Sequence, residues 1–186
     1  MNREELVSEL EKALTKAKVE KLATVAAKSP ESVRSLISLS LYELETVAFR
    51  ASWILEQIFF CYPESFFPNC SHFLNYYPQQ RNSSCQRHYT KIMMTLTKDR
   101  APVIFTHHQV DVIVEASFRW LIDEQTPVAV RVNCMDVLYN LRDCEDWIGE
   151  ELRAQIVYQL KDGSAAMQSR GRKILERLKK KKQRTL

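Results

Sequence analysis

The fold of this chain is decided by a stretch that reads Thr126-Pro-Val-Ala-Val-Arg131-Val-Asn-Cys-Met-Asp-Val-Leu138. Three related stretches read Thr46-Val-Ala-Phe-Arg50-Ala-Ser-Trp-Ile-Leu55, Asn82-Ser-Ser-Cys-Gln-Arg87-His-Tyr-Thr-Lys-Ile92 and Gln168-Ser-Arg170-Gly-Arg-Lys-Ile-Leu175. Their successive arginines are 37, 44 and 39 residues apart. A period near forty residues in a helical chain predicts a solenoid of stacked helix pairs, in which each pair buries its apolar face only against its neighbours.

Composition and spacing both favour helices joined by short loops. The 186 residues include only 3 Gly and 6 Pro, a low count of residues that interrupt helices. Apolar residues recur three and four positions apart. They predict helix pairs over residues 2–28, 30–61, 63–97, 107–142 and 145–182. Because the connections are short, consecutive helices should be antiparallel neighbours. We therefore predict an all-α chain, an α–α superhelix of about five antiparallel helix pairs.

Positive charge is concentrated at the C-terminus. The segment from Arg170 to Arg184 holds nine basic residues against Glu176 alone, whereas the remainder has 18 basic and 22 acidic residues. The acidic body is a poor candidate for a broad nucleic-acid-binding surface. We expect a single domain over residues 1–178 and a frayed basic tail over 179–186. Binding of nucleic acid through the basic segment stays open as an alternative.

The sequence also predicts a cytoplasmic protein. No run approaches the roughly eighteen apolar residues that a membrane span needs, and the charged N-terminus shows no apolar core of a secretion signal. An odd number of cysteines without regular spacing indicates free thiols, mostly buried, in a reducing compartment. They are Cys61, Cys70, Cys85, Cys134 and Cys144.

The segment 127–141 resembles the second helix of a HEAT repeat, for which V-R-x-x-A-x-x-x-L-x-x-L is typical. Val130, Arg131, Leu138 and Leu141 match this pattern, and Cys134 takes the place of the small residue. Together with the other copies, the chain resembles small bacterial HEAT-like proteins over about residues 15–180. The resemblance implies HEAT-like helix pairs. It also implies that the arginine links adjacent repeats through polar contacts, a role that we assign first to Arg131.

These observations predict a non-enzymatic module or scaffold that binds another protein, with no cofactor and no metal. In a stack of helix pairs the second helices line a concave face, which is the expected binding surface. No nucleophile elbow, phosphate-binding glycine loop or metalloprotease helix occurs in the sequence. The candidate binding residues, which could instead be buried links between repeats, are Arg50, Arg87, Arg131, Arg170 and Trp120.

Two enzyme resemblances remain as alternatives. HEAT-like alkylpurine DNA glycosylases use a tryptophan and a nearby aspartate in a concave groove, and Trp120 lies one helical turn from Glu124. Trp120 is more simply a core residue. Gly163, Ser164 and Met167 partly match the flexible signature loop of the adenylosuccinate lyase superfamily, G-S-S-x-M-P-x-K. A glycine stop and a serine N-cap explain the same residues without catalysis.

A zinc site is a further alternative. Cys70, His72, Cys85 and His88 supply four ligand types, and Cys85 and His88 are three residues apart on a predicted helix. Cys70 and His72 do not have a structural-zinc spacing, however. We therefore favour buried cysteines and surface histidines.

Overall fold

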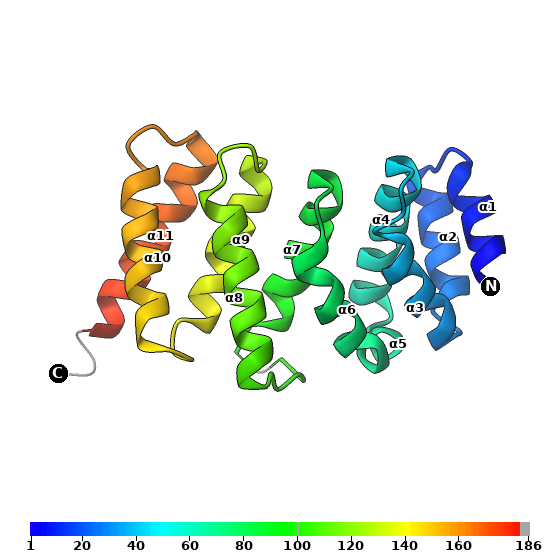
Figure 1. Ribbon diagram of the computed structural model, residues 1–186, viewed down its shortest axis with the longest axis horizontal. Helices are drawn as coiled ribbons and strands as arrows, with labels where there is room; N and C mark the ends of the chain where they lie inside the picture. The colour runs from blue at the N-terminus through cyan, green and yellow to red at the C-terminus, as the bar shows by residue number, and fades with distance from the viewer. Residues whose placement is uncertain (100, 183–186) are drawn as a thin grey trace. The chain divides into compact units, whose positions relative to one another are not determined.

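The computed structural model describes residues 1–99 and 101–182. Within these residues every regular element is a helix, so the predicted all-α fold is confirmed (Figure 1). The chain divides into two compact units, an N-terminal unit over Met1–Ile92 and a C-terminal unit over Met93–Leu186. None of the described helices is both long and apolar enough to cross a membrane.

The N-terminal unit is built on α4, against which α1, α2 and α3 all pack. An irregular segment of short α and 3₁₀ turns then leads to α7, which ends beyond the unit boundary. The helices are α1 (Arg3–Glu11), α2 (Lys16–Ala26), α3 (Pro30–Leu39), α4 (Glu45–Cys61), α5 (Pro63–Phe66), α6 (Cys70–Tyr76) and α7 (Ser83–Leu96).

Aromatic side chains fill the centre of the N-terminal unit. The segment on either side of Pro68 contributes Phe66 and Phe73, both fully buried. The ring of Phe66 lies 5.0 Å from Phe59 and 5.3 Å from Phe73, and Phe73 lies 4.6 Å from Tyr89 on α7. Edge-to-face and tilted contacts of this kind add to the gain from apolar burial. The cluster therefore joins α4, α5, α6 and α7.

The C-terminal unit has α9 at its centre, because α9 packs against α8, α10 and α11. Its apolar residues occur at helical spacing and are fully buried, as Val130, Cys134 and Leu138 show. This is the stretch whose pattern decides the fold. The remaining helices are α8 (His107–Ile122), α9 (Val128–Leu141), α10 (Asp146–Gln159) and α11 (Ala165–Lys182).

Polar side chains set several helix ends inside the predicted pairs. Within 2–28, α1 ends at Glu11, and the extended Thr15 caps α2 through a hydrogen bond from the Lys18 amide. Within 30–61, α3 ends at Leu39, and the next residue, Ser40, donates to the Ile37 carbonyl. Ser40 Oγ also lies 2.5 Å from the buried Tyr89 hydroxyl.

The predicted single domain over residues 1–178 stays a prediction. The basic tail over 179–186 falls partly outside the described residues, of which Lys179 and Lys180 are exposed. All five cysteines are free thiols, and Cys70, Cys85 and Cys134 are buried. Burial raises the pKa of the Cys70 and Cys85 thiols to about 11, so neither is a reactive thiolate.

Candidate functional site

The candidate arginines do not gather in one place. Arg50 on α4 donates to the Leu10 carbonyl in the last turn of α1, at 2.7 Å. Carbonyls in a final helical turn have no partner within their own helix, and Arg50 satisfies one of them. Arg87 on α7 is exposed. Arg50 thus joins two helices of the N-terminal unit, while Arg87 lies at the surface.

Arg131 lies at a joint of three helices. Its Nε donates to the Leu121 carbonyl at the end of α8, at 3.1 Å. The same carbonyl accepts a hydrogen bond from Gln159 Nε2 on α10, at 2.7 Å. A carbonyl has two lone pairs, so both hydrogen bonds can form together. Leu121 therefore connects α8 to its partner α9 and to the first helix of the next pair.

Arg170 on α11 pairs with the buried Asp136 on α9, linking the second helices of two successive pairs. Its Nη1 lies 3.1 Å from Oδ1 and 3.0 Å from Oδ2, and the aligned hydrogen bond goes to Oδ1. Desolvation raises the pKa of Asp136, and this effect exceeds the lowering by the Arg170, Arg177 and Lys98 charges. Trp120 on α8 is only 3% exposed and belongs to the core.

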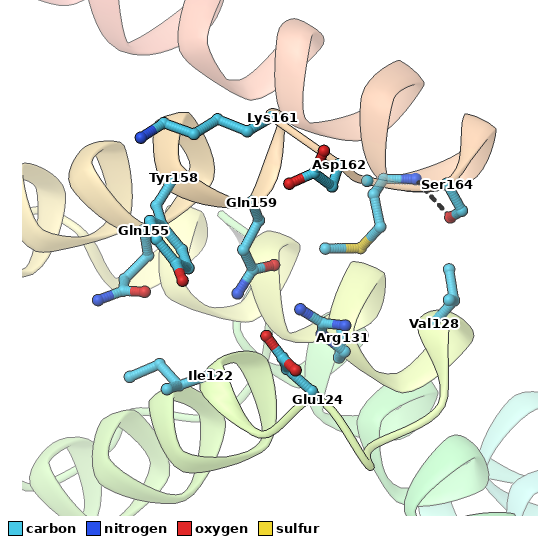
Figure 2. A pocket seen from close by; sticks show the side chains of 12 residues that line it. Ile122, Glu124, Val128, Arg131, Gln155, Tyr158, Gln159, Lys161, Asp162 and Ser164 are labelled. Atoms are coloured by element: carbon cyan, nitrogen blue, oxygen red, sulfur yellow. Dashed lines mark hydrogen bonds between the residues drawn. The ribbon is translucent and has the colours of Figure 1, made fainter.

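A pocket of about 450 Å³ opens at the ends of four helices in the C-terminal unit (Figure 2). We call it the end pocket. It lies between the end of α8, the start of α9, the end of α10 and the start of α11. Its lining comprises Ile122, Glu124, Val128, Arg131, Gln155, Tyr158, Gln159, Lys161, Asp162, Gly163, Ser164 and Met167.

The end pocket contains a buried acceptor without a donor. Gln159 is 9% exposed, and its Oε1 has no hydrogen-bond partner among the described residues. The amide cannot be reversed without loss, because Nε2 is the group that donates to Leu121. Figure 2 shows this amide and the Arg131 guanidinium directed into the same space. Neither Nη group of Arg131 makes a hydrogen bond or an ion pair with the described residues.

Apolar groups form the rim of the end pocket. Tyr158 is 63% exposed, Ile122 is 49% exposed and Val128 is 37% exposed. The lining charges balance in number, since two cations, Arg131 and Lys161, and two anions, Glu124 and Asp162, line the end pocket. An apolar rim with a few convergent polar groups and no net charge suits a neutral ligand that presents both a donor and an acceptor.

Gly163, Ser164 and Met167 also line the end pocket, but their contacts are those of a helix start. Ser164 Oγ accepts a hydrogen bond from the Met167 amide at 3.5 Å, and the Met167 side chain is buried. Gly163 is required by close packing, because an added Cβ would lie 2.6 Å from the Gln159 carbonyl oxygen. The stop-and-cap interpretation accounts for each of these residues.

The four possible zinc ligands have other partners or are buried. His72 Nε2 lies 3.3 Å from Ser38 Oγ, and His88 Nδ1 lies 2.5 Å from Glu56 Oε2. Glu56 also pairs with Lys91. In the part of the chain that the structure describes, no three His, Cys, Asp or Glu side chains converge as a metal site.

Sequence reasoning selected Arg131 but missed Gln159, Tyr158 and Ile122. Gln159 occupies an ordinary position near a helix end, and no local pattern distinguishes it from other glutamines. Tyr158 follows Val157 in the sequence, and two adjacent apolar residues near the end of a predicted helix are the available signal. The sequence gives neither the exposure of these side chains nor the distance between α8 and α10, so this signal does not define a pocket.

The chain is similar to a known protein family and to solved structures in its fold. A family described as HEAT repeat domain matches residues 6–178. No curated protein matches significantly. The crystal structure of an engineered protein from a structural genomics consortium aligns with a TM-score of 0.61 at 13% identity, covering 95% of this chain and 81% of that one. A designed armadillo repeat protein aligns with a TM-score of 0.56 at 13% identity, covering 90% and 78%. At this identity the likeness concerns the fold alone.

Proposed function

Because the chain belongs to the HEAT repeat domain family, we propose that it is a non-enzymatic interaction module of the cytoplasm. Its ligand is an extended segment of a partner polypeptide, which binds in the end pocket. Repeat folds of stacked helix pairs present extended surfaces, and such surfaces suit other macromolecules. The free thiols support a reducing compartment.

The unpaired Oε1 of Gln159 is the observation that carries this proposal. A buried acceptor without a donor costs free energy, and a ligand that brings an N–H group recovers that cost. The adjacent Nη groups of Arg131 can donate to a carbonyl. A peptide group supplies one N–H and one carbonyl, so an extended main chain fits both.

The surroundings of this polar pair favour a polypeptide over an anion. Arg131 and Lys161 are balanced by Glu124 and Asp162, so the end pocket offers no excess positive charge for a phosphate. The exposed side chains of Ile122, Val128 and Tyr158 can contact an apolar side chain of the partner. The buried Trp120 offers no open ring on which a flipped base could stack.

Selection from a random peptide display library on the whole protein tests the proposal. We expect enriched peptides to bind the wild-type protein. Their affinity for the Tyr158→Ser variant and for the Gln159→Met variant should be at least about tenfold lower. Val157→Ser is the matched control, because Val157 is exposed on the same helix and does not line the end pocket. Circular dichroism verifies that each variant is folded.

Two results would overturn the proposal. One is the absence of any enriched peptide whose binding distinguishes Tyr158→Ser from Val157→Ser. The other is a gel-shift series in which single-stranded oligonucleotides bind and Tyr158→Ser weakens that binding.

A further inference from the structure

A basic surface lies on α11, and the pocket beside it shares no lining residue with the end pocket. Arg170, Lys173, Arg177 and Lys180 follow one another at spacings of three and four residues, so they share one face of the helix. Lys173, Arg177 and Lys180 are exposed. We call these four residues the basic stripe. The buried residues Met167, Ile174 and Leu178 form the neighbouring face of α11, which packs on the unit.

The basic stripe borders a pocket of about 460 Å³ that is lined by one cation in an ion pair and two cations outside any ion pair of the described residues. Its lining comprises Met94, Lys98, Asp99, Asp136, Tyr139, Asn140, Arg170 and Arg177. Arg170 is held by Asp136. Arg177 and Lys98 make no hydrogen bond or ion pair with the described residues, although both act electrostatically on Asp136. Two cations thus face this pocket with their hydrogen-bond donors available.

Two guanidinium groups lie over the ring of Tyr139, and this arrangement favours an acidic ligand over a nucleobase. The guanidinium of Arg142 lies 4.1 Å from the ring centroid, and that of Arg177 lies 5.8 Å from it. Cations over the ring fix guanidinium positions and occupy the surface that a base would need for stacking. Arg142 is in turn paired with Asp143 at 3.0 Å, so its charge is already balanced.

We infer that the basic stripe binds an acidic segment of the partner polypeptide, with a carboxylate between Arg177 and Lys98 and further carboxylates along α11. The inference rests on the proposed function in taking the partner to be a polypeptide. Charge complementarity supports it, because the segment from Arg170 to Arg184 is strongly basic while the rest of the chain is mildly acidic. A short acidic segment can follow the stripe, whereas a long polyanion would also meet the acidic body.

Fluorescence anisotropy of a labelled oligoglutamate peptide with the full chain tests the inference. Arg177→Glu and Lys98→Glu should each weaken binding about tenfold, and added salt should weaken wild-type binding. Arg172→Glu is the matched control. It makes the same charge change on an exposed residue of the same helix, and Arg172 donates to Gln168 instead of facing the pocket. We expect it to alter affinity by less than about twofold.

Equal losses from Arg172→Glu and Arg177→Glu would overturn the inference, because net charge alone would then explain binding. No binding by wild type would overturn it as well. A third contrary result is a single-stranded oligonucleotide that displaces oligoglutamate and binds more tightly in an Arg177-dependent manner. Display-selected peptides that depend on Tyr158 and not on Arg177 would leave the proposed function standing while the inference fails.

Discussion

Glu56 and Asp136 are both buried carboxylates, yet their surroundings shift their pKa values in opposite directions. Burial alone would raise the pKa of Glu56, but hydrogen bonds from His88 and Lys91 outweigh it and lower that pKa. At Asp136 the desolvation is larger than the effect of the three cations around it, so its pKa is raised. Relative to the unfolded chain, folding therefore makes ionisation easier for Glu56 and more costly for Asp136.

Replacing Glu56 should reveal a pH-dependent contribution to stability. A lowered pKa means that the ionised carboxylate stabilises the fold above its ordinary pKa of about 4, and that this contribution is lost as the pH falls through the folded value. We expect Glu56→Gln to reduce the free energy of unfolding by about 1–3 kcal/mol at neutral pH. Urea unfolding should show a smaller difference from wild type in acid.

Replacing Asp136 should give the opposite trend. With a raised pKa, wild type loses stability as the pH rises above about 4, since ionisation costs more in the fold than in the unfolded chain. Asp136→Asn keeps the shape and carries no charge. Its stability relative to wild type should therefore increase with pH in the same urea series. A relative stability that decreases with pH would contradict the raised pKa.

Hydrogen bonds from arginine side chains to the last turns of helices connect several helices of this chain. The carbonyls of Leu10 and Leu121 lie in the last turns of α1 and α8, and each accepts a hydrogen bond from an arginine of a later helix. The family resemblance implied that Arg131 links adjacent repeats, but its hydrogen bond to Leu121 lies within one helix pair, whereas that of Arg50 joins successive pairs. The acceptor was not predictable, since it depends on which helix end lies beside the arginine.

A double-mutant cycle measures the joint at Leu121. Arg131→Met and Gln159→Leu each leave the carbonyl one donor, so each should cost about 0.5–1.5 kcal/mol of unfolding free energy. The double variant leaves the carbonyl without a donor and should cost about 1 kcal/mol more than the sum of the single variants. Additive costs in urea unfolding would show that the two hydrogen bonds do not share an acceptor.

Two helical glycines should respond oppositely to alanine because their surroundings differ. A Cβ at Gly171 on α11 would lie 2.9 Å from Ile156 Cγ2 and 3.2 Å from Leu160 Cδ2, so alanine overpacks the contact with α10. A Cβ at Gly149 on α10 would lie 3.7 Å from the Arg142 Cβ, an ordinary contact. We expect Gly171→Ala to destabilise by about 1 kcal/mol or more and Gly149→Ala to stabilise by about 0.5–1 kcal/mol. Thermal unfolding of both variants checks this contrast, and a stabilised Gly171→Ala would contradict the close packing of α10 on α11.

At the scale of the whole molecule, periodicity predicted the fold and could not predict the site. The period near forty residues and the apolar spacing can be read from the sequence, and the helices and the match to the HEAT repeat domain confirm the fold that they predicted. The end pocket is lined by residues from four helices and their loops, and the pocket beside the basic stripe is lined by Lys98 and Arg177, which are almost eighty residues apart in the sequence. A local sequence pattern cannot predict which distant residues line the same pocket. The basic segment was visible in the sequence, but only the structure shows that Arg177 lines the pocket and Arg172 does not.

Site-specific photo-crosslinking in the native cell tests the central claim most directly, with benzoylphenylalanine in place of Tyr158 and, as control, of Val157. The account predicts a discrete protein adduct at position 158 that display-selected peptides suppress, and little adduct at position 157. Adducts of equal yield at both positions, or an adduct at position 158 made only of nucleic acid, would contradict it.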